Sequence, residues 1–165
     1  MREISAYSSE FRDRLAHLGL QPVLIGALAA IRYRLEPRET TDVDFLTLSL
    51  DGLAEAMRAD GHDVRVMAEP GGEPYVVFIR GKGVAVDVLL AETEYQLEAH
   101  GRAVDGVLTV EDVIVHKLLA WRARDRDDVD SILAVGHDLD EAYIEQWAEV
   151  WEVSERWVAA KRSRA

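Results

Sequence analysis

The sequence predicts a domain of the α+β class, with a mixed, mainly antiparallel sheet flanked by helices and with further helices toward the C-terminus. Two observations support this class. Strand patterns alternate with helical ones between residues 23 and 90, whereas the chain beyond residue 109 shows only helical spacing. A Gly-Lys-Gly hairpin signal at 81–83 joins two strand patterns directly, which indicates antiparallel pairing.

The N-terminal part is expected to begin with a helix followed by a short strand. Apolar residues recur every three or four positions over 3–19, which is the spacing of an amphipathic helix. The apolar run 23–25 predicts a buried strand that Gly26 ends. A second helix is expected over 27–35, and Pro37 closes it because the residue before a proline disfavours helical geometry.

Four further strands are expected, at 43–48, 62–67, 75–80 and 84–90. A helix that Asp51 caps and that runs to about residue 60 separates the first two of them. The strand at 84–90 is therefore expected to be a central element, paired through the hairpin with the strand before it.

The C-terminal part is predicted to be helical after one short strand from about residue 102. Thr109 to Asp112 form a capping box that introduces a helix over 111–123. A second helix is expected over 127–136, and residues 140–162 are helical by pattern. We expect residues 1–136 to form the main domain and residues 137–165 to be a C-terminal helical extension of the same unit.

Composition and charge exclude several classes of function. The chain has 31 acidic and 19 basic residues, for a net charge of −12, which argues against a general nucleic-acid-coating protein. It has no cysteine, so thiol catalysis, disulfides and cysteine-bound zinc are excluded. No segment approaches the ~18 apolar residues of a membrane span, and no secretory signal is present, so we expect a cytoplasmic protein with no membrane partner.

Three carboxylates on predicted strands are the main candidates for chemistry. Asp42 and Asp44 are two residues apart on one strand, so their side chains project to the same face. Asp87 occupies a similar setting within Val-Ala-Val-Asp-Val-Leu-Leu. Anions on one face repel each other, and a divalent cation such as Mg²⁺ would offset this repulsion. A solvated strand edge is the simpler interpretation of the Asp-x-Asp pair taken alone.

These features, in this order, resemble the nucleotidyltransferase fold of the DNA polymerase β superfamily. The matching residues are a strand-ending Gly26-Ala27, the series Arg38-x-Thr40-x-Asp42-x-Asp44, and Asp87 on a later strand. The similarity is strongest to small bacterial nucleotidyltransferase-like proteins, which include abortive-infection toxin-type enzymes. Their Arg-x-Ser/Thr-x-Asp-x-Asp motif is matched at every fixed position.

The C-terminal half carries a further part of the resemblance. A helix with a lysine, followed by an Arg-Asp-x-x-Asp segment, is typical of the same group, and here these are Lys117 and residues 124–128. The resemblance covers about residues 21–133. From the residues alone, Lys117 could equally be an ordinary surface or ion-paired residue, and the arginines of 122–126 alternate with acids as in a self-paired helix junction.

The resemblance implies a nucleotidyltransferase-like fold and a metal-dependent transfer of a nucleoside monophosphate from an NTP to an acceptor hydroxyl. Mg²⁺ or Mn²⁺ would be bound by Asp42, Asp44 and Asp87, and Asp87 could instead act as the base. The other positions carried over from the family, with roles toward phosphate, are Gly26, Ala27, Arg38, Thr40 and Lys117. It also implies a possible role in a toxin–antitoxin or phage-defence system.

One position departs from the family pattern. The family usually has Gly or Ser after the strand-ending glycine, and this chain has Ala27, which keeps the backbone amide but lacks a hydroxyl donor. The alternative function is therefore a catalytically inactive binding module on the same fold, acting through a protein partner. The acceptor stays open between RNA, a protein side chain and a small molecule, as does the choice between a protein partner and a homo-oligomer.

Overall fold

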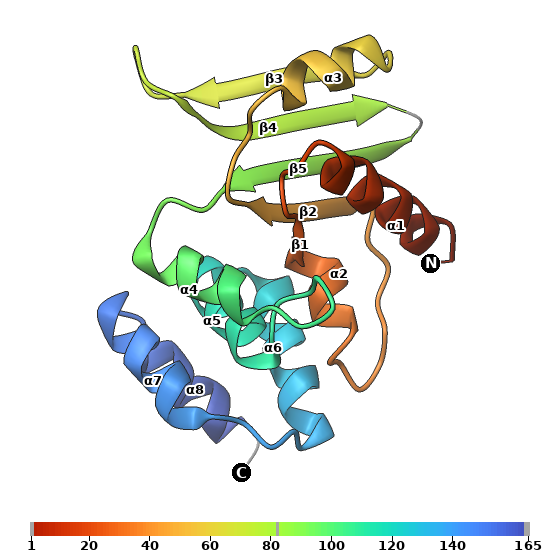
Figure 1. Cartoon of the computed structure of the whole chain (residues 1–165). Coiled ribbons are helices and arrows are strands. Elements are labelled where there is room, and N and C mark those ends of the chain that lie inside the picture. Colours follow the sequence, from red (N-terminus) through yellow and green to blue (C-terminus); the bar gives the residue numbers. More distant parts are fainter. Residues whose placement is uncertain (1, 82, 164–165) are drawn as a thin grey trace.

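A computed structural model describes residues 2–81 and 83–163 and shows a five-stranded sheet with helices around it (Figure 1). The strands are β1 (Val23–Ile25), β2 (Asp42–Thr47), β3 (Asp63–Ala68), β4 (Pro74–Gly81) and β5 (Val84–Leu90). Their order in the sheet is β1-β2-β5-β4-β3. The β2–β5 pair is parallel and the other three pairs are antiparallel, so the predicted α+β class with a mixed sheet is confirmed.

The helices form two groups relative to the sheet (Figure 1). The first group lies close to the strands and consists of α1 (Arg2–His17), α2 (Gly26–Ile31) and α3 (Leu53–Ala59). The second group gathers beyond the β1 edge and consists of α4 (Glu94–Arg102), α5 (Val110–Ala120), α6 (Ala123–Val135), α7 (Glu141–Val150) and α8 (Ser154–Arg162). The buried apolar side chains form two clusters: one lies between the sheet and helices α1 and α3, and the other lies among the second group of helices and also includes Ala29 and Ala30 of α2.

The two faces of the sheet differ sharply in burial. Residues that alternate along the strands, such as Val43, Val77 and Val86, are fully buried against Phe11 and Leu15 of α1 and the apolar side of α3. The residues between them on β2, β3, β4 and β5 point the other way, and within β3 and β4 none of these is fully buried. We call this second side the open face of the sheet; it carries Asp42, Asp44 and Asp87.

The structure corrects the sequence prediction at several boundaries. The short strand expected from residue 102 is absent from the described residues; α4 occupies 94–102, followed only by isolated bridges at Val104 and Val107. A capping box between Thr93 and Gln96 starts α4. The sequence analysis did not predict this helix, although both capping residues are visible in the sequence. The capping box expected at Thr109 is confirmed in part, because the Thr109 hydroxyl accepts from the Asp112 amide.

Three helix limits also differ from expectation. α2 ends at Ile31 instead of residue 35, and Gly52 rather than Asp51 precedes α3. The expected tail helix over 140–162 is two helices, because Glu152 adopts a positive φ of 57° in the turn between α7 and α8. Each difference arises from local backbone geometry that apolar periodicity does not report.

No helix within 2–81 and 83–163 combines the length and the apolar character that crossing a lipid bilayer would need.

A buried polar contact ties the second group of helices together. The carboxylate of Asp112 on α5 is fully buried, and it accepts hydrogen bonds from the Tyr143 hydroxyl of α7 (2.7 Å) and from the Thr109 hydroxyl (2.7 Å). Arg102 at the end of α4 adds a third contact at 3.3 Å. Helices α4, α5 and α7 therefore meet at one carboxylate. The side chains of Arg102, Thr109 and Tyr143 all donate hydrogen bonds to it.

We expect Asp112→Ala to lower the free energy of unfolding by about 3 kcal/mol, because it leaves buried hydroxyl groups without an acceptor. Asp130→Ala, at an exposed carboxylate on α6, is the matched control and should change stability by less than about 0.5 kcal/mol. Urea unfolding followed by circular dichroism measures both, and equal stabilities for the two variants would contradict the prediction.

Candidate active site

The candidate carboxylates meet because β2 and β5 run parallel in matched register. Asp44 is the direct partner of Asp87, and Asp42 lies opposite Ala85. Asp42 is exposed, whereas Asp44 and Asp87 are partly buried. Like charges on neighbouring strands of one face repel each other. Burial, and then the charges of Asp87 and Asp42, raise the pKa of Asp44 to about 6.

Gly26 lies directly against this carboxylate. Ile25, the last residue of β1, is the register partner of Asp44, and Gly26 follows with a positive φ of 67°. A Cβ atom at position 26 would lie 2.0 Å from Oδ2 of Asp44, which no side chain can tolerate. A glycine is therefore required here both by the backbone conformation and by the space that Asp44 occupies. Ala27 follows it in α2.

The remaining hydroxyl groups of the predicted motif lie around Asp42. The Thr40 hydroxyl accepts from the Asp42 amide at 3.4 Å, which fixes the chain as it enters β2. Thr41, which the sequence analysis did not single out, donates its hydroxyl to Oδ1 of Asp42 at 3.3 Å. Thr40 thus has a local role in the backbone, and a role toward phosphate stays a prediction.

Lys117 and Arg38 are both held by buried carboxylates of α6. The Lys117 ammonium lies 2.9 Å from Asp128 and 3.1 Å from Asp125, and its side chain is 7% exposed. Arg38 makes a two-pronged contact with Asp128 at 2.7 and 2.9 Å. Arg34 is a further partner of Asp128. We call these five residues the ionic hub.

The hub explains how full burial of its acids is tolerated. Burial alone would raise the pKa of Asp128, but hydrogen bonds from Arg38 and Lys117 lower it to about 2. The pKa of Asp125 is also lowered, since hydrogen bonds from Arg122 and Lys117 outweigh the effect of its burial. Both acids therefore stay ionised. Of the interpretations that the sequence allowed for Lys117, the ion-paired residue is the one that the structure shows.

Arg122 is the functional candidate that the sequence analysis missed. Its guanidinium pairs with Asp125 at 2.7 Å, which confirms the self-paired interpretation of this residue, yet its side chain stays 67% exposed. Arg122 and Lys117 are both near enough to Asp44 for their charges to lower its pKa against the effects of burial. The positive charge and the candidate carboxylates therefore share one region, and only Arg122 of the two cations reaches solvent. No spacing rule would have selected it among the neighbouring arginines.

Asp87 has a partner of its own that was also not foreseen. Nη1 of Arg80 on β4 lies 2.7 Å from Oδ1 of Asp87 and also donates to the backbone oxygen of Val86 at 3.1 Å. Within residues 2–81 and 83–163, no group of three or more acidic or histidine side chains is assembled closely enough to hold a metal ion. The metal role of Asp87 therefore stays a prediction.

The donor chemistry of the remaining pair fits Mg²⁺ or Mn²⁺. Hard divalent cations take oxygen ligands and are commonly held by one or two carboxylates together with phosphate oxygens of the substrate. Asp42 and Asp44 supply such oxygens, and the charges of Asp87 and Asp42 add to burial in raising the pKa of Asp44. An added cation would relieve that repulsion.

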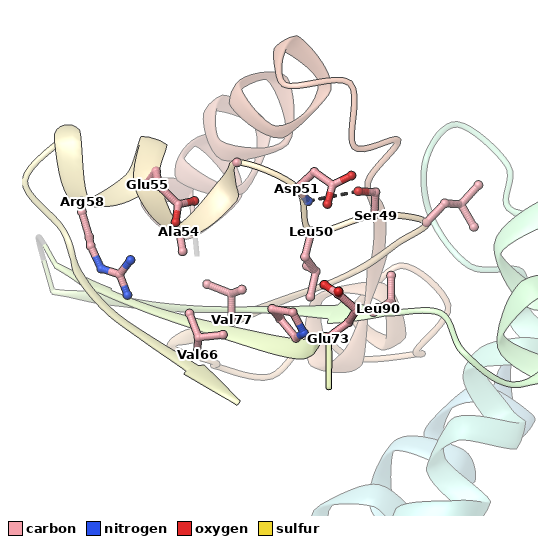
Figure 2. Close-up of a pocket in the computed structure, with 13 residues that line it drawn as sticks. Ser49, Leu50, Asp51, Ala54, Glu55, Arg58, Val66, Glu73, Val77 and Leu90 are labelled. Atoms are coloured by element: carbon pink, nitrogen blue, oxygen red, sulfur yellow. Dashed lines mark hydrogen bonds between the residues drawn. The ribbon is translucent and has the colours of Figure 1, made fainter. Parts of the chain in front are cut away.

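A cavity of about 640 Å³ lies elsewhere, on the covered side of the sheet (Figure 2). Val66 and Val77 form part of its floor, and Glu55 and Arg58 of α3 stand at its rim. Because side chains alternate along a strand, Val77 points away from the face that bears Asp44 and Asp87. The cavity is therefore separated from the candidate carboxylates by the sheet itself.

Comparison with solved structures places the fold among nucleotidyltransferase-like proteins. The solution structure of the antibiotic-resistance factor ANT(2'')-Ia matches with a TM-score of 0.60 at 14% identity, over 99% of this chain and 98% of that one. A nucleotidyltransferase-like antigenic protein from Paracoccidioides brasiliensis matches with a TM-score of 0.52 at 16% identity, over 97% and 92% of the two chains. Neither a family model nor a curated protein matches the sequence. The predicted nucleotidyltransferase-like fold is thus confirmed.

The raised pKa of Asp44 predicts a pH-dependent stability in the metal-free protein. Its folded-state pKa of about 6 lies above the ordinary value of 3.8, so the folded state binds the proton more tightly than the unfolded chain. Stability from this group is present below pH 4 and falls, by at most about 3 kcal/mol, as the pH rises to 6 and beyond. Asp44→Asn should therefore be more stable than wild type at pH 7.5, with the difference vanishing near pH 4.

Urea unfolding of both proteins at these pH values measures this difference, and Asp63→Asn is the control, at an exposed carboxylate of β3. A stability gain for Asp44→Asn that does not change with pH would contradict the pKa assignment.

We also expect Lys117→Ala to cost about 2–3 kcal/mol of unfolding free energy, because it removes one charged hydrogen-bond partner from each of two buried carboxylates. Lys161→Ala is the matched control: Lys161 also contacts two carboxylates, Glu141 and Glu145, but at the surface. Its loss should cost no more than about 1 kcal/mol. Thermal and chemical unfolding compare the two, and a Lys117→Ala protein as stable as Lys161→Ala would show that the hub is not a stabilising element.

Proposed function

We propose that this protein is a metal-dependent nucleotidyltransferase that moves a nucleoside monophosphate from an NTP to an acceptor hydroxyl. The observation that supports it most directly is the pairing of Asp44 with Asp87 on parallel strands, with Gly26 against Asp44 and with Arg122 nearby. The nucleotidyltransferase-like fold supports the same activity.

The three acids divide between two roles in this proposal, metal binding and proton acceptance. Asp42 and Asp44 hold Mg²⁺ or Mn²⁺, with Asp87 as a third ligand or as the base. The ion supplies charge neutralisation at the phosphate oxygens. Asp87, with Arg80 on one of its oxygens, keeps the other oxygen to accept the proton of the attacking hydroxyl. The oxygen of that hydroxyl forms a bond to the α-phosphorus while the bond to the β-phosphate oxygen breaks and pyrophosphate leaves.

The cations act by two different routes. Arg122 is solvent-exposed and can contact the triphosphate directly, because a guanidinium matches phosphate oxygens in a two-pronged geometry. Arg38 and Lys117 are engaged by Asp128, so their contribution is to fix α6 and the loop before β2 around the site. Gly26 and Ala27 meet the phosphates through their backbone, and Thr40 holds the entry to β2.

The wider setting is part of the same proposal. A role in a bacterial toxin–antitoxin or phage-defence system, in the cytoplasm, follows from the resemblance of the sequence motifs to toxin-type enzymes. The second candidate is an inactive module of this fold that acts through a protein partner. Ala27, which offers no hydroxyl to a phosphate, is the observation that favours it.

Turnover separates the two functions. Purified protein is incubated with Mg²⁺, each of the four NTPs in turn and a cell lysate, and both pyrophosphate release and label transfer are measured. Transfer supports the enzyme, whereas NTP binding without any transfer supports the inactive module. Failure of NTP to bind with or without metal excludes both.

We expect Asp42→Asn and Asp44→Asn each to reduce nucleotidyl transfer by about 10²-fold or more, since each removes a charge that acts at the reacting phosphate. Both variants should keep a wild-type circular dichroism spectrum, because the change preserves side-chain shape. Asp63→Asn, on the open face but outside the site, is the control and should retain full activity. Unfolding of either site variant at room temperature would show that the carboxylates are structural.

A further inference from the structure

One side of α1 carries small polar residues at helical spacing. Ser5, Ser8, Ser9 and Arg12 recur every three or four positions, so their side chains share one side of the helix. Ser8 is only 7% exposed and lies three residues before the buried Phe11, so a serine occupies a position of α1 that faces the interior. A serine fills less space than the large apolar residues that usually occupy such positions, and this leaves a gap beside the helix.

The gap is a cavity of about 260 Å³ between α1 and the segment formed by β1 and α2. Three aliphatic side chains form its apolar wall, Leu24 of β1 and Leu28 and Ile31 of α2. Arg12 of α1 and Arg32 at the end of α2 complete the lining, one from each helix. No acidic residue of the described chain lines this cavity. It therefore combines an apolar wall with two cations.

The cavity is separate from the candidate carboxylates. Leu24 is the register partner of Phe45, which is fully buried on the side of the sheet that α1 covers. Asp44, one position earlier in β2, points to the other face because side chains alternate along a strand. Leu24 and Leu28 lie on either side of Gly26 in the sequence, so a ligand in the cavity contacts both elements that hold Gly26 against Asp44.

The hydroxyl of Ser8 is a polar group whose hydrogen-bonding capacity the fold leaves unused. Ser8 lines the cavity, and within the described residues its hydroxyl forms no hydrogen bond with any side chain or backbone group. Polar groups of buried residues normally have a partner. An unpartnered hydroxyl at the wall of a cavity therefore indicates that a ligand group meets it there.

The two arginines make the cavity locally positive in a protein whose net charge is −12. Nη1 of Arg12 donates to the backbone oxygen of Asp105 at 3.2 Å, and Nη2 of Arg32 lies 3.5 Å from the carboxylate of the same residue. That carboxylate is 79% exposed, so this ion pair is a weak surface contact. Two guanidinium charges against one carboxylate leave a net of one positive charge for a ligand to meet.

A small monoanion with an apolar tail matches these properties. One net positive charge suits a carboxylate, whereas a phosphate monoester carries about −1.5 to −2. A guanidinium also matches the two oxygens of a carboxylate in a planar geometry. Cavities for drug-sized ligands begin at about 300 Å³, so a nucleotide, a peptide or a second copy of this chain does not fit.

We propose that the cavity between α1 and α2 binds a small carboxylic acid with an aliphatic tail. Its carboxylate pairs with Arg12 and Arg32 and accepts a hydrogen bond from Ser8, which is a neighbour of Arg12 on the surface of α1 because four residues separate them. The tail packs on Leu24 and Leu28. This binding site goes beyond the proposed transfer reaction, and no step of that reaction uses it.

The experiment is an amide chemical-shift titration of the ¹⁵N-labelled protein with hexanoate, without metal or NTP. The shifts should concentrate in residues 5–12 and 24–32. Arg32→Gln should weaken binding about tenfold, because it removes a charged hydrogen-bond partner. Arg58→Gln is the matched control, at an exposed arginine of α3 that lines the other cavity (Figure 2), and it should bind hexanoate as the wild type does.

Two further comparisons test the shape and the charge of the site. Ser8→Leu fills the cavity with an apolar side chain and should abolish the hexanoate-induced shifts without changing the circular dichroism spectrum. Arg32 is exposed at the end of α2, so Arg32→Gln tests the site even if Ser8→Leu fails to fold. Hexyl phosphate and hexylammonium carry the same tail with other charges, and both should bind more weakly than hexanoate.

Three outcomes overturn the proposal. They are an absence of hexanoate-induced shifts in α1 and α2, an equal loss of affinity in Arg32→Gln and Arg58→Gln, and binding of hexyl phosphate or hexylammonium as tight as that of hexanoate. Asp44→Asn should bind hexanoate with wild-type affinity, and a loss of binding in this variant would place the acid at the candidate carboxylates instead. None of these results depends on whether the protein transfers nucleotides, so the two proposals fail independently.

Discussion

The parallel pairing of β2 with β5 is the constraint on which the rest of the site depends. It is the one parallel pair in the described sheet, and its register places Asp44 directly opposite Asp87. A shift of β2 by one residue would turn Asp44 into the apolar layer beneath α1 and would expose Val43. The burial of the valines therefore holds the two acids together against their repulsion, and the apolar face fixes the geometry of the polar one.

The ionic hub complements this constraint from the helical side of the same region. Arg38 comes from the segment before β2, and Asp128 lies ninety residues later on α6, so their contact fixes the helical group relative to the sheet. Breaking a buried ion pair is costly because it leaves an uncompensated charge. Residues that a motif assigns to phosphate binding can thus serve the site indirectly, by holding Arg122 and its helix in place.

Much of this organisation could be predicted from the sequence, and the failures have physical causes. Strand β5 was predicted with its observed limits, because Val84, Val86 and Val88 alternate around Asp87 after a clear turn signal. The pairing of Lys117 with α6 could not be read, since a lysine in a helix shows nothing of what faces it across space. Arg122 was missed because exposure and proximity to Asp44 are properties of the fold. The division at residue 136 stays a prediction, although α5 and α7 share one core.

The position of β3 at the rim of the sheet has a consequence for solubility. A free edge strand exposes unpaired amide and carbonyl groups that can template cross-molecular β-pairing and aggregation. This one carries the exposed charges of Asp63 and Arg65, and its pairing with β4 is irregular between Met67 and Ala68, which interrupts a straight edge. Arg65 therefore helps to keep the edge strands of neighbouring molecules from pairing with β3. A charged residue at this position is useful for that reason alone, whatever the acceptor is.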